Sequence, residues 1–457
     1  MSTEPLLRVS SVQVEGLFDQ FDHRVDLEPN ERVTILHGPN GVGKTMLLRM
    51  VSDLLRGRYN LFLKVPFRRF ALALTDGSES DGGSKTELTI SPHPSQGNSE
   101  SSKVLELSLL EDGKQKETHE VSNSKDFLSL LGEIARSVVQ AARAGENKGL
   151  GERDDSLITT EEVDDLYADE IHPERLRDHR IYSESEWLKA LRGSVAVHLI
   201  EAQRLLRLNA DHPSGDQIRP DNLYMVSEYA NDLSVRINDT MAHYGQQSQR
   251  LDQSFPQRLL TSPPPTLSTD DLKARMEELD IKQAELKEIG LLDKPEDYPF
   301  DTAALDTLNP ASQRVMSLYV QDTSDKLEVL TDLARRTRLL LDNVNHKFLH
   351  KRIRIDREAG LVAERDDGIP LELEALSSGE QHELVLHYDL LFRVRPNTLV
   401  LIDEPELSLH VAWQKRFLPD LLEIVAAARF DVLIATHSPY IVGDRSDLMI
   451  GLGEDPV

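Results

Sequence analysis

The first part of the chain is a series of short apolar runs separated by turn residues. Such runs are typical of β-strands, and they occur at 6–9, 12–15, 25–27 and 33–36. The last run leads directly into residues 46–55, where apolar side chains recur at three- and four-residue spacing. This spacing predicts a helix that begins directly after a buried strand.

Beyond this helix the pattern changes to alternating apolar and polar residues, broken by segments rich in Ser, Gly and Asp. The alternation extends from Arg69 to about Val121 and predicts the hairpins of an antiparallel β lobe. We expect an amphipathic helix at 126–144 and a flexible loop in the polar, acidic stretch 145–178. The apolar run 195–200 predicts a further buried strand.

The middle of the chain predicts helices, and strands return near the end. Three long stretches have helical spacing and predict a helical insertion that packs on itself: 224–249, 270–289 and 312–349. Strands and helices then alternate. The predicted strands are 352–355, 361–363, 371–373, 398–402 and 432–435, and the predicted helices are 379–392 and 411–428.

The junction between the strand 33–36 and the helix 46–55 carries a complete phosphate-binding pattern. The pattern G-x-x-x-x-G-K-[ST] is matched by Gly38, Pro39, Asn40, Gly41, Val42, Gly43, Lys44 and Thr45. The glycines let backbone N–H groups converge on phosphate, Lys44 reaches the terminal phosphates, and Thr45 offers a hydroxyl to Mg²⁺. We therefore expect ATP and Mg²⁺ here; the alternative is a glycine-rich turn that only caps a helix.

Two adjacent carboxylates end the apolar strand 398–402. Neighbouring residues of a strand point to opposite sides, so Asp403 and Glu404 are expected to have different roles. Asp403 suits the Mg²⁺ shell beside Thr45, directly or through water, and Glu404 suits the general base that polarises the attacking water. Pro405 stops the strand there. The alternative is a pair of acids solvated in a loop.

A second phosphate-binding turn is expected where the helix 379–392 begins. Ser377 and Glu380 have the spacing of a capping box, which satisfies backbone N–H groups at a helix N-terminus. The same geometry presents N–H groups and a hydroxyl to an anion, and Gly379 permits close approach. Helix capping alone is the alternative for this turn.

Two single polar residues follow apolar strands. Gln203 comes shortly after 195–200, where its amide could reach the metal or the attacking water, although a surface position is the simpler interpretation of this residue alone. His437 comes directly after 432–435. With the other motifs in place, a contact with the γ-phosphate or the water is favoured for His437 over a structural role.

Composition narrows the classes of function. The formal net charge of -27 opposes sequence-independent adhesion to nucleic acid, which needs clustered Lys and Arg, although a local basic groove stays open. The chain has no Cys, which excludes disulfides, Cys-ligated zinc and thiol catalysis. We recognise neither a signal peptide nor an apolar stretch of about 20 residues, so an acidic cytoplasmic protein is expected.

Together these motifs resemble those of the ATP-binding-cassette (ABC) ATPases. Walker A corresponds to 38–45, the Q-loop to Gln203, the signature to 376–381, Walker B to 399–404, the D-loop to 406–410 and the switch histidine to His437. The resemblance implies an α/β P-loop NTPase head with a mixed sheet and an antiparallel β lobe. The head would comprise 1–205 and 351–457, with the helical insertion at 206–350.

The resemblance also implies an assembly. In this class two heads dimerise with ATP between the Walker A of one copy and the signature of the other. The signature departs from Leu-Ser-Gly-Gly-Gln by having Ser378 in place of the first Gly and Glu380 before Gln381. This variant is similar to chromosome-maintenance and repair ATPases rather than to transporters.

Within the class, the runs 376–381, 403–410 and 435–439 are similar to the overcoming-lysogenisation-defect (OLD) group. This group includes bacterial anti-phage ATPases of the Septu, PARIS, Gabija and retron-associated systems, and some members carry a Toprim nuclease domain after the head. Because the chain ends at Val457, soon after His437, the resemblance implies a stand-alone ATPase, as in Septu or PARIS. Its implied partners are a separate effector, an HNH nuclease or a Toprim-like toxin, and a phage-derived trigger.

Three other functions stay open. A DNA-repair or chromosome-associated ATPase, SMC- or RecF-like, would use the helical insertion as a short arm, but the charge of -27 weighs against it. A structural scaffold would bind nucleotide and hydrolyse it slowly. A transporter subunit fits least, because the helical insertion is far longer than a coupling subdomain.

Overall fold

The computed structural model describes residues 7–76, 86–94, 103–122, 185–200, 222–261, 266–293 and 302–453. They form two compact units, the first Met1–Asp221 with Val394–Val457 and the second Asn222–Arg393. By contacts, residues 351–393 therefore group with the helical insertion, and the division expected at 205/206 and 350/351 remains a prediction. The helix expected at 126–144, the loop at 145–178 and Gln203 lie outside the described residues.

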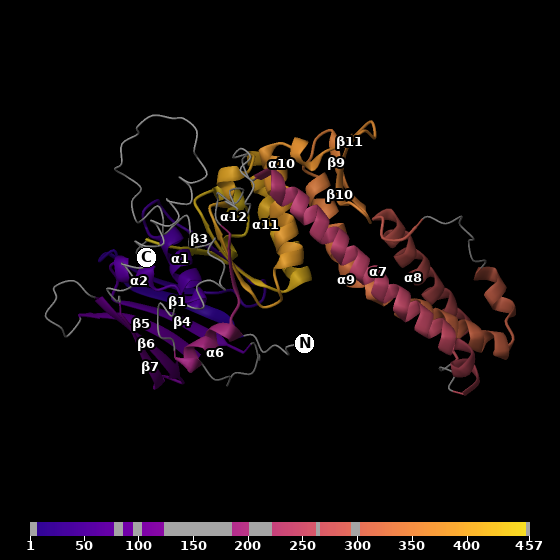
Figure 1. Ribbon diagram of the computed structural model, residues 1–457, viewed down its shortest axis with the longest axis horizontal. Helices are drawn as coiled ribbons and strands as arrows, with labels where there is room; N and C mark the ends of the chain where they lie inside the picture. Colours follow the sequence, from indigo (N-terminus) through magenta and orange to yellow (C-terminus); the bar gives the residue numbers. More distant parts are fainter. Residues whose placement is uncertain are drawn as a thin grey trace, which may run out of the picture. The chain divides into compact units, whose positions relative to one another are not determined.

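A five-stranded parallel sheet belongs to the first unit (Figure 1). In spatial order its strands are β14 (Met449–Gly451), β3 (Val33–His37), β13 (Asp431–Thr436), β12 (Leu399–Asp403) and β8 (Val197–Ile200). β3, β12 and β13 are buried along almost their whole length, as expected for continuous apolar runs in a sheet covered on both faces. The carboxyl ends of these strands lie at one edge of the sheet, so the segments that follow them meet there.

Helix α1 (Lys44–Arg56) covers part of this sheet and starts at the phosphate-binding motif. It packs against β8, β12 and β13 through an apolar face. Gly57 ends the helix with a left-handed backbone (φ 73) and donates its N–H to the last carbonyl groups. The other helices in the described part of this unit are α2 (Asn60–Lys64), α6 (Glu186–Ser194), α11 (Val411–Ala428) and α12 (Pro439–Val442).

The antiparallel β lobe is present as a separate six-stranded sheet. Its spatial order is β2 (Phe21–Asp26), β1 (Arg8–Leu17), β4 (Arg69–Thr75), β5 (Thr86–Pro94), β6 (Lys103–Glu111) and β7 (Lys114–Ser122). β1 is one strand where two were expected. Its pairing with β4 continues across the polar residues between the two predicted strands, with a register shift between Val9 and Ser11. The buried face of this sheet shares one apolar core with α1 and α2.

The second unit contains the predicted helical insertion. Helices α7 (Asn222–Thr261), α8 (Thr269–Glu288) and α9 (Pro310–Asn345) lie side by side as an elongated bundle (Figure 1). A small sheet of order β11 (Pro370–Leu371), β10 (Gly360–Arg365) and β9 (Lys351–Asp356) follows. Helix α10 (Ser378–Tyr388) continues as a π-helical turn at Asp389–Arg393. Short 3-10 turns occur at Thr302–Thr307, Leu373–Ala375, Pro405–Ser408 and Ser446–Leu448.

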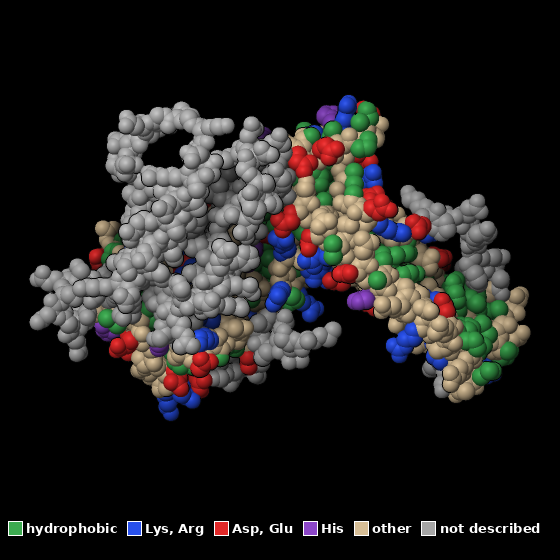
Figure 2. All heavy atoms as spheres, viewed as in Figure 1, with side chains coloured by type: hydrophobic (Ala, Val, Ile, Leu, Met, Phe, Trp, Pro, Cys, Tyr) green, Lys and Arg blue, Asp and Glu red, His purple; other side chains and the backbone are tan. Residues whose placement is uncertain are grey.

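The predicted fold class is confirmed: the chain is an α/β P-loop NTPase with an antiparallel β lobe and a helical insertion. The mixed sheet that was expected is not seen among the described strands, because the parallel and antiparallel ones belong to separate sheets. No helix in the described ranges is both long and apolar enough to cross a membrane. Figure 2 shows acidic and basic side chains interspersed over the visible described surface.

Candidate functional site

The turn between β3 and α1 has the backbone that a phosphate-binding loop needs. Gly41 and Gly43 have φ angles of 85° and 98°, a region that residues with a Cβ rarely adopt. A Cβ at Gly43 would lie 2.6 Å from the Leu17 side chain, and one at Gly38 would lie 2.5 Å from the Leu452 carbonyl oxygen. All three positions therefore require glycine, for reasons of backbone angle, space or both.

Lys44 begins helix α1 and folds back over the loop that precedes it. Its ammonium group donates hydrogen bonds to the carbonyl oxygens of Gly38 (2.7 Å) and Pro39 (3.1 Å), and the residue is buried. Gly43 at the N-cap offers no side chain to the first-turn N–H groups. A buried cation and uncapped N–H groups thus lie together at a helix N-terminus, which favours a bound phosphate.

Thr45 and Asp403 meet at the carboxyl edge of the parallel sheet. The Thr45 hydroxyl donates a hydrogen bond of 2.9 Å to Oδ1 of Asp403, although 358 positions separate the two residues in the sequence. A hydroxyl and a carboxylate are hard oxygen ligands that suit Mg²⁺, which keeps several waters and binds substrate phosphates. The donor set therefore fits the predicted metal.

Other metal sites are not apparent in the part of the chain that the structure describes. It contains no group of three or more His, Cys, Asp and Glu side chains that could hold a metal ion. A Thr–Asp pair is below that number. Such a site relies on nucleotide phosphates and water for its remaining ligands.

Glu404 has a backbone that strand alternation does not explain. β12 ends at Asp403, and Glu404 takes a left-handed conformation (φ 44°, ψ 57°) before Pro405. Asp403 and Glu404 are therefore not neighbours within a strand, and the expectation that they point to opposite sides for that reason does not hold. The left-handed turn sets the direction of the Glu404 side chain. Its N–H still donates to the Ala435 carbonyl (2.9 Å), and its side chain is partly exposed to water at the sheet edge.

Glu406 is a residue that sequence reasoning does not single out, and it organises the turn that carries His437. Its Oε1 accepts hydrogen bonds from the Thr436 hydroxyl (2.7 Å) and from the N–H groups of His437 (3.0 Å) and Ser438 (3.2 Å). Nδ1 of His437 lies 3.2 Å from the same oxygen and 3.8 Å from Oε1 of Glu404. The sequence gives two signals for it: Glu406 is a third acid two positions beyond the carboxylate pair, and it begins the run 406–410 that resembles a D-loop.

Ser377 and Gly379 lie in the second unit, at the N-terminus of α10. The predicted capping box is present: the Ser377 N–H donates to Oε2 of Glu380 (2.7 Å), and the Glu380 N–H donates to the Ser377 hydroxyl (3.4 Å). Lys351 forms an ion pair of 2.8 Å with Glu380. Burial alone would raise the pKa of Glu380, but Lys351 and Ser377 outweigh burial and lower it. Ser377 stays exposed.

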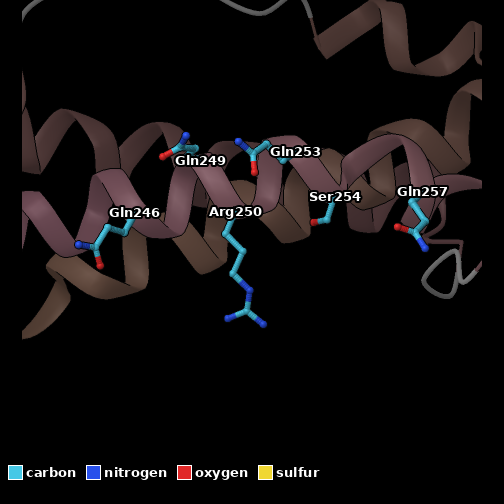
Figure 3. Close-up of a pocket in the computed structure, with 6 residues that line it drawn as sticks. All are labelled: Gln246, Gln249, Arg250, Gln253, Ser254 and Gln257. Carbon is cyan, nitrogen blue, oxygen red and sulfur yellow. The ribbon is translucent and has the colours of Figure 1, made fainter.

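A depression of about 490 Å³ lies along one face of α7, in the second unit (Figure 3). All of its lining residues come from this single helix: Gln246, Gln249, Arg250, Gln253, Ser254 and Gln257. No second element encloses it, and it contains none of the predicted site residues. It therefore lacks the convergent walls of a small-molecule site.

The sequence matches one family model. A family model described as "AAA domain, putative AbiEii toxin, Type IV TA system" matches residues 33–443. Comparison with curated proteins gave no match.

Solved structures similar to this chain include two Smc head domains. One, with an extended coiled coil and bound to the C-terminal domain of ScpA, derives from Pyrococcus furiosus; it is 13% identical, with 98% of this chain and 93% of that chain covered and a TM-score of 0.39. Another, with a coiled coil and joint, derives from Pyrococcus yayanosii; it is 12% identical, with 98% and 95% covered and a TM-score of 0.34. Likenesses of this size carry no argument about function.

Proposed function

The chain belongs to this family of AAA domains, as a P-loop ATPase related to the ABC ATPases, and from that premise we propose that it hydrolyses ATP with Mg²⁺. The observation that carries the proposal is the hydrogen bond of 2.9 Å between Thr45 and Asp403. It joins the phosphate loop to the C-terminal end of β12, where Asp403 lies. Two motifs that are far apart in sequence thereby form one site.

Each group at the sheet edge has a role in this proposal. Lys44 and the loop N–H groups bind the β- and γ-phosphates, and Thr45 and Asp403 hold Mg²⁺. When bound there, Mg²⁺ would neutralise charge on the phosphate oxygens. Glu404 orients the attacking water and takes its proton as the water oxygen bonds to the γ-phosphorus and ADP leaves. His437 contacts the γ-phosphate or the water.

A second copy of the chain completes the site in our proposal. Lys44 and its loop supply donors to one side of the terminal phosphate, and charge that develops on this phosphate is stabilised best by donors on both sides. Ser377 is an exposed residue and lies with Gly379 at a helix N-terminus, which suits the other side of this phosphate. The proposed assembly is a homodimer, or a higher oligomer built from it.

The wider role that we propose is control of a separate effector in anti-phage defence. The OLD-like runs 376–381, 403–410 and 435–439 support it, and so does the family description, which refers to a Type IV TA system. A pull-down from the native host, together with the identity of the neighbouring open reading frames, tests this role. An HNH nuclease or Toprim-like protein is expected; strong, salt-sensitive DNA binding by the chain alone would favour a repair function instead.

The Glu404→Gln variant tests the proposed hydrolysis. The amide keeps the size of the side chain but cannot take a proton, so turnover should fall by about 10²- to 10⁴-fold while ATP still binds. Steady-state phosphate release and equilibrium ATP binding measure the two effects. Glu423→Gln, which neutralises an exposed carboxylate on α11, is the matched control and should behave as the wild type. Unchanged turnover in Glu404→Gln would remove this residue as the base.

A further inference from the structure

Glu406 is a buried carboxylate whose two oxygens have very different surroundings. Its side chain is 5% exposed. Oε1 accepts all three hydrogen bonds from the turn after β13, whereas Oε2 is buried without a hydrogen-bond partner. Desolvating a carboxylate is costly, and a neutral oxygen acceptor would cap the same donors at lower cost. Capping alone therefore does not account for an acid at this position.

The imidazole of His437 supplies a reason for the negative charge. Its Nδ1 lies close to two carboxylate oxygens, at 3.2 Å from Glu406 and 3.8 Å from Glu404. In a neutral imidazole one nitrogen carries the proton and the other a lone pair. A lone pair on Nδ1 would face two negative groups, whereas an N–H there is attracted to both. The surroundings therefore favour the tautomer with the proton on Nδ1.

The backbone of the same turn is held by the same side chain. Oε1 of Glu406 fixes the main-chain N–H of His437 as well as lying next to its ring. Gln414 of α11 adds a further tie, because its amide donates to the Glu406 carbonyl (3.2 Å) and accepts from the Ser438 hydroxyl (3.0 Å). The backbone of His437 is thus held by Glu406 and Gln414, and its ring lies beside the same Glu406 oxygen.

We propose that Glu406 is a positioning residue for His437: it holds the ring with Nδ1 protonated and leaves Nε2 as the nitrogen that contacts the nucleotide or the attacking water. Carboxylates that orient a functional imidazole through its other nitrogen act in this way. The kinetic consequence rests on the proposed ATPase function. The tautomer does not, so the two can be tested separately.

The tautomer is tested by ¹⁵N NMR of the histidine rings in the full-length protein, without nucleotide and with the rings neutral. The signals of His437 are identified by their loss in His437→Gln. The wild type should show Nδ1 protonated, and Glu406→Gln, which keeps an oxygen acceptor but removes the charge, should shift the ring towards the Nε2-protonated form. A wild-type ring already protonated on Nε2, or no change in the variant, would overturn the proposal.

Kinetics test the consequence. Glu406→Gln should lower kcat for ATP by about 10- to 100-fold with little change in KM, because the ring acts on the reacting phosphate rather than on binding. Glu406→Asp, which retains the charge, should recover part of kcat, and Glu423→Gln should have no effect. An altered tautomer with unchanged kcat would refute the positioning role. A wild type without ATPase activity would refute the proposed function and leave the NMR result standing.

Discussion

At the scale of single residues, the contact between Thr45 and Asp403 joins the phosphate-binding motif to the end of β12. The two oxygens are 2.9 Å apart and come from α1 and β12. The hydroxyl donates a hydrogen bond to the carboxylate. These two residues would hold Mg²⁺, and a divalent cation would gain more from the charged carboxylate than from a neutral group.

Asp403→Asn should therefore weaken the effect of Mg²⁺ on ATP binding. The amide oxygen still accepts from Thr45, so the fold is retained, but the missing charge should lower Mg²⁺ affinity by at least about tenfold. Calorimetric titration with ATP, with and without Mg²⁺, measures this. Metal-free ATP affinity serves as the internal control. The same gain in affinity from Mg²⁺ in variant and wild type would show that Asp403 is not a ligand.

The sequence predicts which side chains meet at this edge better than it predicts how they point. Apolar strands followed by Gly38, Asp403 and His437 indicate one edge, because parallel strands end together. The direction of Glu404 depends on a left-handed residue before a proline. The contacts of Glu406 depend on the path of a strand about thirty positions later. The spacing of apolar residues along the sequence determines neither the backbone angles of a turn nor the path of a distant strand.

At the scale of elements, helix α10 is joined to the turn that follows α9 by a buried charged cluster. Lys347 lies 2.8 Å from Oε1 of Glu383, and Nδ1 of His387 lies 2.9 Å from Oε2, with all three side chains almost fully buried. Burial by itself would raise the pKa of Glu383, but His387 and Lys347 lower it to about 2. The ionised carboxylate is thus the form that joins α10 to this turn.

Removing this carboxylate should destabilise the second unit in a pH-dependent way. The folded pKa is depressed from 4.5 to about 2, so the contribution is present above about pH 4.5 and is lost as the pH falls towards 2. Glu383→Gln should lower the free energy of unfolding by about 3 kcal/mol at neutral pH, with a smaller loss in acid. Denaturant unfolding at several pH values measures this.

A surface ion pair in the same unit provides the control for Glu383. Glu288 pairs with Arg338 across an exposed contact of 2.7 Å. Glu288→Gln should therefore change stability by no more than about 1 kcal/mol at any pH. Equal losses in the two variants, or a Glu383→Gln loss that does not diminish in acid, would contradict the role of the buried cluster.

Helix positions follow from periodicity, but helix ends follow from tertiary contacts. The spacing predicts the first insertion helix to end at 249, whereas α7 continues to Thr261 and includes Pro256. Arg258, just beyond the proline, forms an ion pair of 2.6 Å with the buried Asp322 of α9. Packing against a neighbouring helix thus favours a continuous helix where local preference favours a break.

At the scale of the whole molecule, the candidate site residues are divided between two compact units. Lys44, Asp403 and His437 belong to the first, and Ser377 and Gly379 to the second. The insertion was predictable from its helical spacing, but the grouping of 351–393 with it was not. That grouping comes from the packing of α10 on α7 and α9 and from the ion pair of Glu383 with Lys347, which follows α9. Local sequence does not encode these contacts.

A two-copy site makes a prediction that a one-copy site does not. Lys44→Ala disables the phosphate loop of its own chain, and Ser377→Arg blocks the signature turn that we propose serves the partner copy. Each variant alone should lack ATPase activity. In a mixed dimer, the loop of the Ser377→Arg chain meets the intact turn of the Lys44→Ala chain, so one of the two sites is complete.

Mixing the two inactive variants should therefore restore ATP hydrolysis. If subunits exchange freely and the sites act independently, an equal mixture contains half mixed dimers with one good site each, which gives about a quarter of wild-type activity. Phosphate release after mixing measures this, and a mixture of Lys44→Ala with Glu404→Gln is the control. In that control the only intact loop lies beside the substituted base, so activity should stay low. Absence of recovery in the first mixture, with exchange demonstrated by labelled chains, would place both phosphate contacts in one copy.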